Sequence, residues 1–93
     1  MIKSFASKET EKIFNREFSK KLPQNIQRVA MRKLWMLHAV KDLTELMIPP
    51  SNQLEALSGD RKGQHSIRIN QQRRICFKWV KGDAEGVEIV HYH

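Results

Sequence analysis

The residues best suited to chemistry lie near the C-terminus, in the stretch RRICFKW that begins at Arg73 and in the final residues HYH. RNA carries its own nucleophile, the 2′-OH, so a protein that cuts RNA must orient that group, move protons and stabilise charge on phosphorus. His93 can give or take a proton near neutral pH. Arg74 can stabilise the charged phosphorus, and Tyr92 can stack on a base. These side chains indicate RNA cleavage without a metal.

Metal-dependent chemistry has less support in the sequence. It has no carboxylate cluster for Mg²⁺, no HxxxH or HExxH motif and no glycine-rich phosphate loop. His91 and His93 lie two residues apart and would share one strand face, but no third ligand accompanies them. Cys76 is the only cysteine and lies in an apolar strand pattern, which indicates a buried, inert thiol. We therefore expect neither a metal nor a cofactor.

Length and charge limit the class of protein. The chain has 93 residues, which predicts one domain over residues 1–93 with one modest core and a shallow groove. Lys and Arg number 17 against 10 Asp and Glu, a formal charge of +7. This excess favours a nucleic-acid or acidic partner, although a merely soluble basic domain has the same composition. The N-terminus has no apolar signal-peptide core, and no stretch is apolar enough to span a membrane, so we expect a cytoplasmic protein with no membrane partner.

The elements that must position these residues are two helices followed by strands. Residues 2–5 alternate like a short strand, and Ser7 is a candidate N-cap for a first helix that continues through Phe18 toward the basic run SKKL. Pro23 suits the first position of a second helix, whose apolar stripe extends to Val40. Strand patterns follow at residues 54–57, 64–70, 73–80 and 87–93, with a polar loop at 81–86. This order predicts an α+β fold, with two N-terminal helices packed on one face of a small antiparallel sheet.

The two sheet faces differ in character. The apolar face must lie under the helices and carries Ile67, Ile69, Ile75, Phe77 and Trp79. The other face would show Ser66, Arg68, Arg74 and Lys78, a basic surface suited to phosphate contacts. Pairing of residues 87–93 with the strand at 73–80 would bring Tyr92 and His93 near Arg74. Arg73 would point to the opposite face or its rim. A solvated face with scattered charges is the plainer alternative.

Three stretches together resemble one family. They are MIKSF…KETEKIF, RKLWMLHAV…DL…PPSNQLEALSGDRKGQHSIRINQQRRICFKW and VEIVHYH, which cover nearly the whole chain. They resemble the HigB toxins of the RelE/ParE superfamily in type II toxin–antitoxin systems. The resemblance implies a RelE-like toxin that enters the A site of the ribosomal 30S subunit and cleaves mRNA there. It also implies a HigA-type helix-turn-helix antitoxin, whose complex with the toxin binds operator DNA.

The resemblance also implies roles for individual residues. Arg74 matches the arginine assigned to the scissile phosphate, Tyr92 is assigned to base stacking or proton transfer, and His93 to acid–base work. Ser58, Arg73 and His91 depart from the family pattern, where a lysine, a tryptophan and an acid are usual. We include His91 among the candidate catalytic residues because it is titratable. The candidate RNA- or ribosome-binding residues are Arg61, Lys62, Arg68, Arg73 and Lys78.

Two other functions share the expected fold. They remain open because a fold does not fix a function. A ParE-like toxin would inhibit DNA gyrase without cutting RNA. A basic RNA-binding module would bind RNA without any chemistry. The combination of Arg74 with Tyr92 and His93 argues against the gyrase inhibitor, since a pure binder would not need it. Codon-phased cuts in mRNA on translating ribosomes would distinguish the toxin nuclease from the other two.

Overall fold

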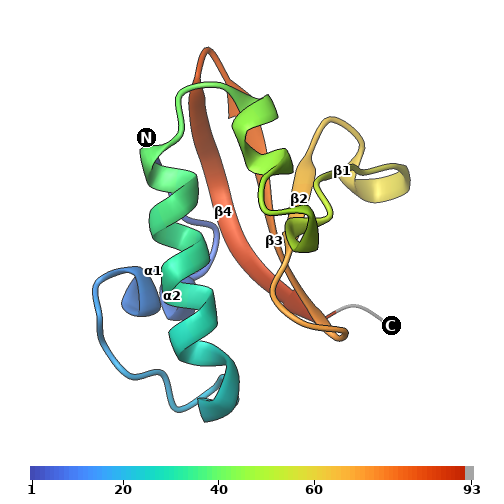
Figure 1. Ribbon diagram of the computed structural model, residues 1–93. Coiled ribbons are helices and arrows are strands. Elements are labelled where there is room, and N and C mark those ends of the chain that lie inside the picture. Colours follow the sequence, from blue (N-terminus) through green and yellow to red (C-terminus); the bar gives the residue numbers. More distant parts are fainter. Residues whose placement is uncertain (92–93) are drawn as a thin grey trace.

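A four-stranded antiparallel sheet forms the centre of the computed structural model, which describes residues 1–91. Its strands are β1 (Glu55–Ala56), β2 (His65–Arg68), β3 (Arg73–Val80) and β4 (Asp83–His91), arranged in that order. Two helices precede them, α1 (Lys8–Phe14) and α2 (Gln24–Ala39), and Figure 1 shows both on one side of β4. Three short 3-10 helices, η1 (Leu43–Met47), η2 (Pro50–Asn52) and η3 (Gly59–Arg61), connect α2 to the strands and flank β1. The predicted α+β fold is confirmed.

The core lies between α2 and the apolar face of the sheet. Ile67, Ile75 and Phe77 are fully buried there, as are Leu34 and Leu37 of α2. The helical repeat and the alternation along β2 and β3 place these side chains on facing surfaces. The predicted apolar face is therefore the one that the helices cover. Among the described residues, no helix is long and apolar enough to cross a membrane.

The N-terminal residues extend the sheet at its β4 edge. Residues 2–5 run parallel to β4 through two isolated bridges, Ile2 to Ala84 and Phe5 to Val87. Backbone hydrogen bonds join them, including Lys3 N to Ala84 O at 2.8 Å and Val87 N to Ser4 O at 3.1 Å. The strand expected at 2–5 is thus a bridged segment. It pairs with backbone groups at the β4 edge that would otherwise be open to solvent.

The first helix ends earlier than its apolar pattern indicates. Ser7 is the N-cap as expected, accepting from Thr10 N at 3.3 Å, but α1 stops at Phe14 and does not reach Phe18. The reason is a Schellman motif: Arg16 takes a left-handed conformation (φ 66°) and donates to Ile13 O, while Glu17 N donates to Lys12 O at 2.8 Å. Glycine usually occupies the left-handed position, so an arginine at this position did not indicate that the helix ends here.

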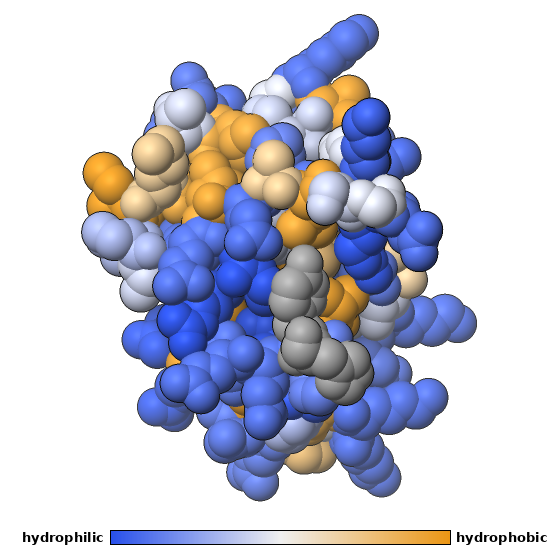
Figure 2. All heavy atoms as spheres, turned by 90° about the vertical axis from the view of Figure 1, so that its right-hand side faces the viewer, coloured by the Kyte–Doolittle hydropathy of each residue, from blue (hydrophilic) through white to orange (hydrophobic). Residues whose placement is uncertain are grey.

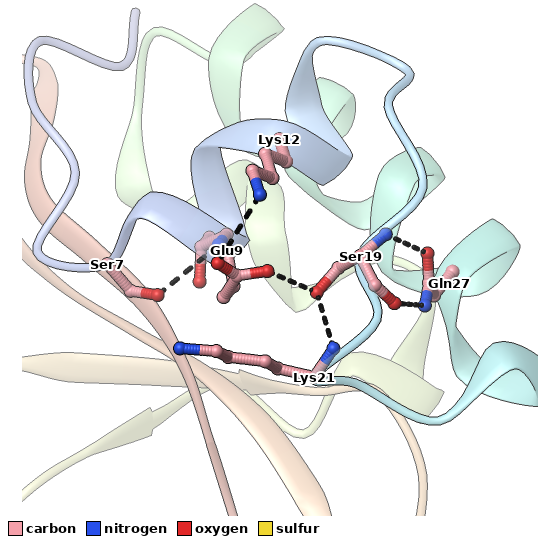
Figure 3. Close-up of polar contacts among 7 residues, drawn as sticks. Ser7, Glu9, Lys12, Ser19, Lys21 and Gln27 are labelled. Carbon is pink, nitrogen blue, oxygen red and sulfur yellow. Dashed lines mark hydrogen bonds and ion pairs between the residues drawn. The ribbon is translucent and has the colours of Figure 1, made fainter.

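A buried serine fixes the connection between the two helices. Ser19 Oγ donates to Glu9 Oε1 at 2.6 Å, and Gln27 of α2 both accepts from Ser19 N (3.1 Å) and donates to Ser19 O (2.7 Å), as Figure 3 shows. The hydrogen bond from Ser19 is the largest cause that lowers the pKa of Glu9. Lys12 adds an ion pair to the same carboxylate at 3.6 Å. These bonds hold α1 and α2 as one layer over the sheet.

The connection between β3 and β4 is shorter than the predicted loop at 81–86. Lys81 and Gly82 alone form the turn, with φ of 50° and 84°, which is the type I′ geometry that matches strand twist. Residues 83–86 belong to β4, where a bulge with Gly86 at φ 60° shifts the register. Pairing of Ala84 with the N-terminal segment stabilises this part of β4, and composition could not reveal that long-range contact.

Candidate active site on the polar face of the sheet

Arg74 is the most tightly held of the predicted site residues. Only 7% of it is exposed, and Gln53, which precedes β1, contacts it. Its Nε donates to Ser66 Oγ at 2.7 Å, and one terminal nitrogen donates to Gln53 O at 2.5 Å and to Ser66 O at 3.5 Å. A buried guanidinium requires such acceptors. The prediction that Arg74 shares an open basic surface is therefore wrong as to exposure, although its strand face is as expected.

The face around Arg74 carries both signs of charge. The register places Cys76 between Ser66 and Glu88, and Lys78 opposite Glu85. Acidic side chains therefore lie among the cations, and the face is less basic than the sequence predicted. Figure 2 shows the side of the molecule that carries β1, where hydrophilic residues cover most of the lower part and apolar residues gather above.

Arg61 links the η3 loop to β4. One of its terminal nitrogens lies 2.9 Å from Glu88 Oε1, and the other donates to Gln64 Oε1 at 3.1 Å. Both ion-pair partners are partly buried, so this pair holds η3 near the central strands more firmly than an exposed pair would. Arg61, predicted to bind RNA, thus also has a structural contact. Lys62 and Lys78 are exposed.

Arg73 and His91 lie together at the rim of the other face. They are direct cross-strand partners, in line with the pair Ile75 and Ile89 on the apolar face. Arg73 is partly buried and His91 is exposed. This register agrees with the expectation that Arg73 points away from Arg74, and it gives His91 the same side as Arg73.

Arg68 occupies the end of β2 and is the cross-strand partner of Arg74. Its Nε donates to Asn70 O at 3.1 Å, and its side chain lines an open groove shared with α2. Tyr92 and His93, which were predicted to complete the site, lie outside the described residues. Their expected position near Arg74 stays a prediction.

Several residues that shape the site gave little signal in the sequence. Gln53 holds Arg74 through its backbone carbonyl, and its own φ of 45° is left-handed. Every residue has a backbone carbonyl, so residue types could not predict a carbonyl contact between positions 21 residues apart. Glu88 was missed as the partner of Arg61. Alternation had already placed Ser66 on the face of Arg74, although its hydrogen bond to Arg74 was not predicted.

Two further titratable side chains, those of Cys76 and His38, have surroundings that indicate a structural role. Cys76 is fully buried, and burial raises the pKa of its thiol, in agreement with the expected inert cysteine. His38 packs on the ring of Phe14 and accepts from Ile2 N through Nδ1 at 3.1 Å. Among residues 1–91, no group of three or more His, Cys, Asp or Glu side chains is arranged to hold a metal ion.

Comparison with known proteins finds a matching family model and several similar proteins. The family model described as a RelE-like toxin of the type II toxin–antitoxin system HigB matches residues 3–93. Toxin HigB-1 of Vibrio cholerae serotype O1 is 44% identical over 63 residues, which cover 68% of this chain and 66% of that protein. An uncharacterized protein of Haemophilus influenzae is 34% identical over 67 residues, again 66% of its length. Endoribonuclease HigB of Proteus vulgaris is 32% identical over 96 residues, which cover both chains completely.

Proposed function

The chain belongs to the family of RelE-like toxins of HigB type II toxin–antitoxin systems, and from this premise we propose that it is a ribosome-dependent endoribonuclease that cleaves mRNA in the 30S A site. Residues 1–93 act as a single toxin domain. The name of the Proteus relative, Endoribonuclease HigB, supports the activity, because that alignment covers both chains completely. The observation that carries the proposal is Arg74, a guanidinium fixed in orientation on the polar face of the sheet.

In this mechanism Arg74 stabilises the transition state. The 2′-oxygen attacks the adjacent phosphorus, the bond to the 5′-oxygen breaks, and a 2′,3′-cyclic phosphate forms. Negative charge grows on the non-bridging oxygens as the 2′-oxygen attacks. The bonds to Ser66 and Gln53 fix the guanidinium before RNA arrives, so little reorganisation is needed when that charge develops.

The proton transfers fall to residues at the end of the chain. One group must take the proton of the 2′-OH and another must protonate the leaving 5′-oxygen. We assign one of these steps to His93, and Tyr92 either makes the second transfer or stacks on a base. His91, exposed beside Arg73, is a third titratable candidate. This equipment is modest, so the ribosome must orient the mRNA.

Binding of RNA relies on exposed cations. Lys62 and Lys78 are exposed and suit phosphate contacts, and Arg73 lies at the rim. Arg61 keeps η3 in place through Glu88 and contributes its charge from there. No cofactor takes part in the proposed reaction.

The partners follow from the family. A toxin of a type II toxin–antitoxin system has an antitoxin partner. We assign it the HigA type with a helix-turn-helix domain, and operator DNA is bound only through the complex. Ribosome and mRNA are the targets of the toxin, which acts in the cytoplasm and not at a membrane.

Mapping of mRNA 5′ ends on translating ribosomes tests the proposal. The wild type should give codon-phased cuts, and Arg74→Ala should reduce their rate by about 10²–10³-fold, the usual loss for a charge-stabilising group. Arg28→Ala, which removes an exposed arginine of α2, is the matched control and should cut normally. Intact mRNA together with inhibited gyrase supercoiling would instead support the ParE-like reading.

Because Arg74 is buried, its replacement needs a folding control. Arg74→Ala should still bind the antitoxin, and Arg74→Lys keeps the charge while it loses the planar fork. Loss of cutting in a variant that retains antitoxin binding assigns the effect to chemistry. Unchanged growth inhibition by Arg74→Ala would remove Arg74 from the site.

A further inference from the structure

A second basic region begins at Arg68, at the end of the polar face, and lies between α2 and the turn that joins β2 to β3. It is an open groove of about 440 Å³. The polar residues that line it are Arg32, Lys33, Ser51, Arg68, Asn70 and Gln71. Among the described residues that line it, none is acidic, so three cations face one groove without a carboxylate in its wall.

The structure holds two of these cations in place. Lys33 Nζ donates to the side-chain oxygen of Asn52, which is fully buried and itself donates to Leu46 O at 3.1 Å. Arg68 is held through its bond to Asn70 O. Arg32 is exposed, and within residues 1–91 no ion pair involves any of the three. Burial lowers the pKa of Lys33, and the like charge of Arg32 lowers it further.

The groove adjoins the candidate active site. Arg68 pairs directly with Arg74 across β2 and β3, so their Cα atoms lie about 5 Å apart. β1 pairs only with His65 and Ser66, and therefore does not cover the edge of β2 at Arg68. A line of cations thus leads from Arg74 around the end of β2 to Lys33 and Arg32 on α2.

We propose that this groove binds RNA phosphates that neighbour the scissile phosphate on the same strand. The inference rests on the proposed function, since that function supplies RNA at Arg74. Three cations with amide and hydroxyl neighbours suit a sugar–phosphate backbone and do not read bases. A polyanion can follow the groove and the active site continuously, which would orient the strand for attack.

Salt titration of RNA binding tests the groove. The probe is a labelled single-stranded RNA whose 2′-hydroxyls are methylated, so that it cannot be cut, and binding is followed by fluorescence anisotropy. The variant Arg32→Gln/Lys33→Gln/Arg68→Gln should reduce the slope of log affinity against log salt by about 2, since each phosphate contact on a single strand contributes about 0.7. The matched control, Lys3→Gln/Lys8→Gln/Lys20→Gln, removes the same charge from exposed positions outside the groove and should change the slope far less.

A second arm separates two sources of phosphate. Binding to ribosomes without mRNA reports on ribosomal RNA, and the methylated strand reports on mRNA. A selective loss with the methylated strand supports the groove as a site for the cleaved RNA, whereas a loss confined to ribosomes without mRNA would overturn that assignment. If groove and control variants behaved equally in both arms, the proposal that the groove binds RNA would be overturned. This would hold even if the groove variant had lost affinity for the antitoxin. Should the triple variant fail to fold, Arg32→Gln/Arg68→Gln leaves the Lys33–Asn52 bond intact and should still reduce the slope by about 1.4.

This outcome is separable from that of the proposed function. A wild type that binds RNA through the groove but leaves mRNA intact would end the nuclease assignment and keep the groove. A wild type that cuts mRNA with groove variants indistinguishable from the control would end the groove assignment and keep the nuclease.

Discussion

The two faces of the sheet are covered by different kinds of structure. On one face Ile67, Ile75 and Phe77 are buried under helices, and the contacts are apolar. On the other, Ser66 and Arg74 are buried with the irregular chain around Gln53. Apolar burial has no direction, so it tolerates changes that keep volume and hydrophobicity. A buried charge instead requires every acceptor in place.

This difference separates stability from chemistry. The apolar face can lose a methylene and keep the geometry of the other face. The polar face cannot lose an acceptor of Arg74 without moving or destabilising the charge itself. Changes on the two faces should therefore differ in kind: the first should alter only the free energy of unfolding, and the second should alter both that free energy and cleavage.

Deletion of His93 should have the largest effect on cleavage. If His93 is the acid or base, removal should slow mRNA cutting by about 10²–10⁴-fold, the usual contribution of such a group. The rate is measured in single-turnover reactions on ribosomes programmed with one mRNA. Antitoxin affinity, measured in parallel, should be unchanged and serves as the folding control. A change below about threefold would remove His93 from the reaction.

Ser66→Ala should affect both stability and cleavage. The variant leaves Arg74 Nε without its acceptor in a fully buried position, which should lower the free energy of unfolding by about 1.5–3 kcal/mol. Cleavage should fall as well, because the guanidinium loses its orientation. Urea unfolding and the ribosome assay measure the two effects.

Ser58→Ala is the matched control for that variant. Ser58 is exposed and its side chain caps no N–H of η3, so unfolding should change by no more than about 0.5 kcal/mol. Equal effects of the two serine variants would show that the polar face does not depend on the Ser66–Arg74 bond.

Local patterns predicted the apolar face well. Alternation along RRICFKWV gave the bounds of β3 at Arg73–Val80, and the helical stripe gave α2 to within one or two residues. The periodicity of apolar side chains determines the bounds of both elements, and this periodicity can be read directly from the sequence. The same alternation correctly predicted on which face of the sheet Arg74 lies.

The covering of the polar face could not be predicted. It depends on the Gln53 carbonyl and on the reach of Arg61 to Glu88, contacts between distant positions. The turn at Lys81 and Gly82 was missed for a related reason, since the N-terminal segment and a bulge decide how far β4 extends. Tertiary contacts outweigh local composition at these places.

Ile75→Val should have the smallest effect and tests the apolar face alone. Ile75 is fully buried, so loss of one methylene should lower the free energy of unfolding by about 0.5–1.5 kcal/mol. Cleavage per folded molecule should be unchanged, although Ile75 directly follows Arg74 in β3. Ile48→Val makes the same change at a residue that is 75% exposed and should leave unfolding nearly unaltered. If Ile75→Val slowed cleavage as much as Ser66→Ala, the two faces would be mechanically coupled, and the separation of stability from chemistry would fail.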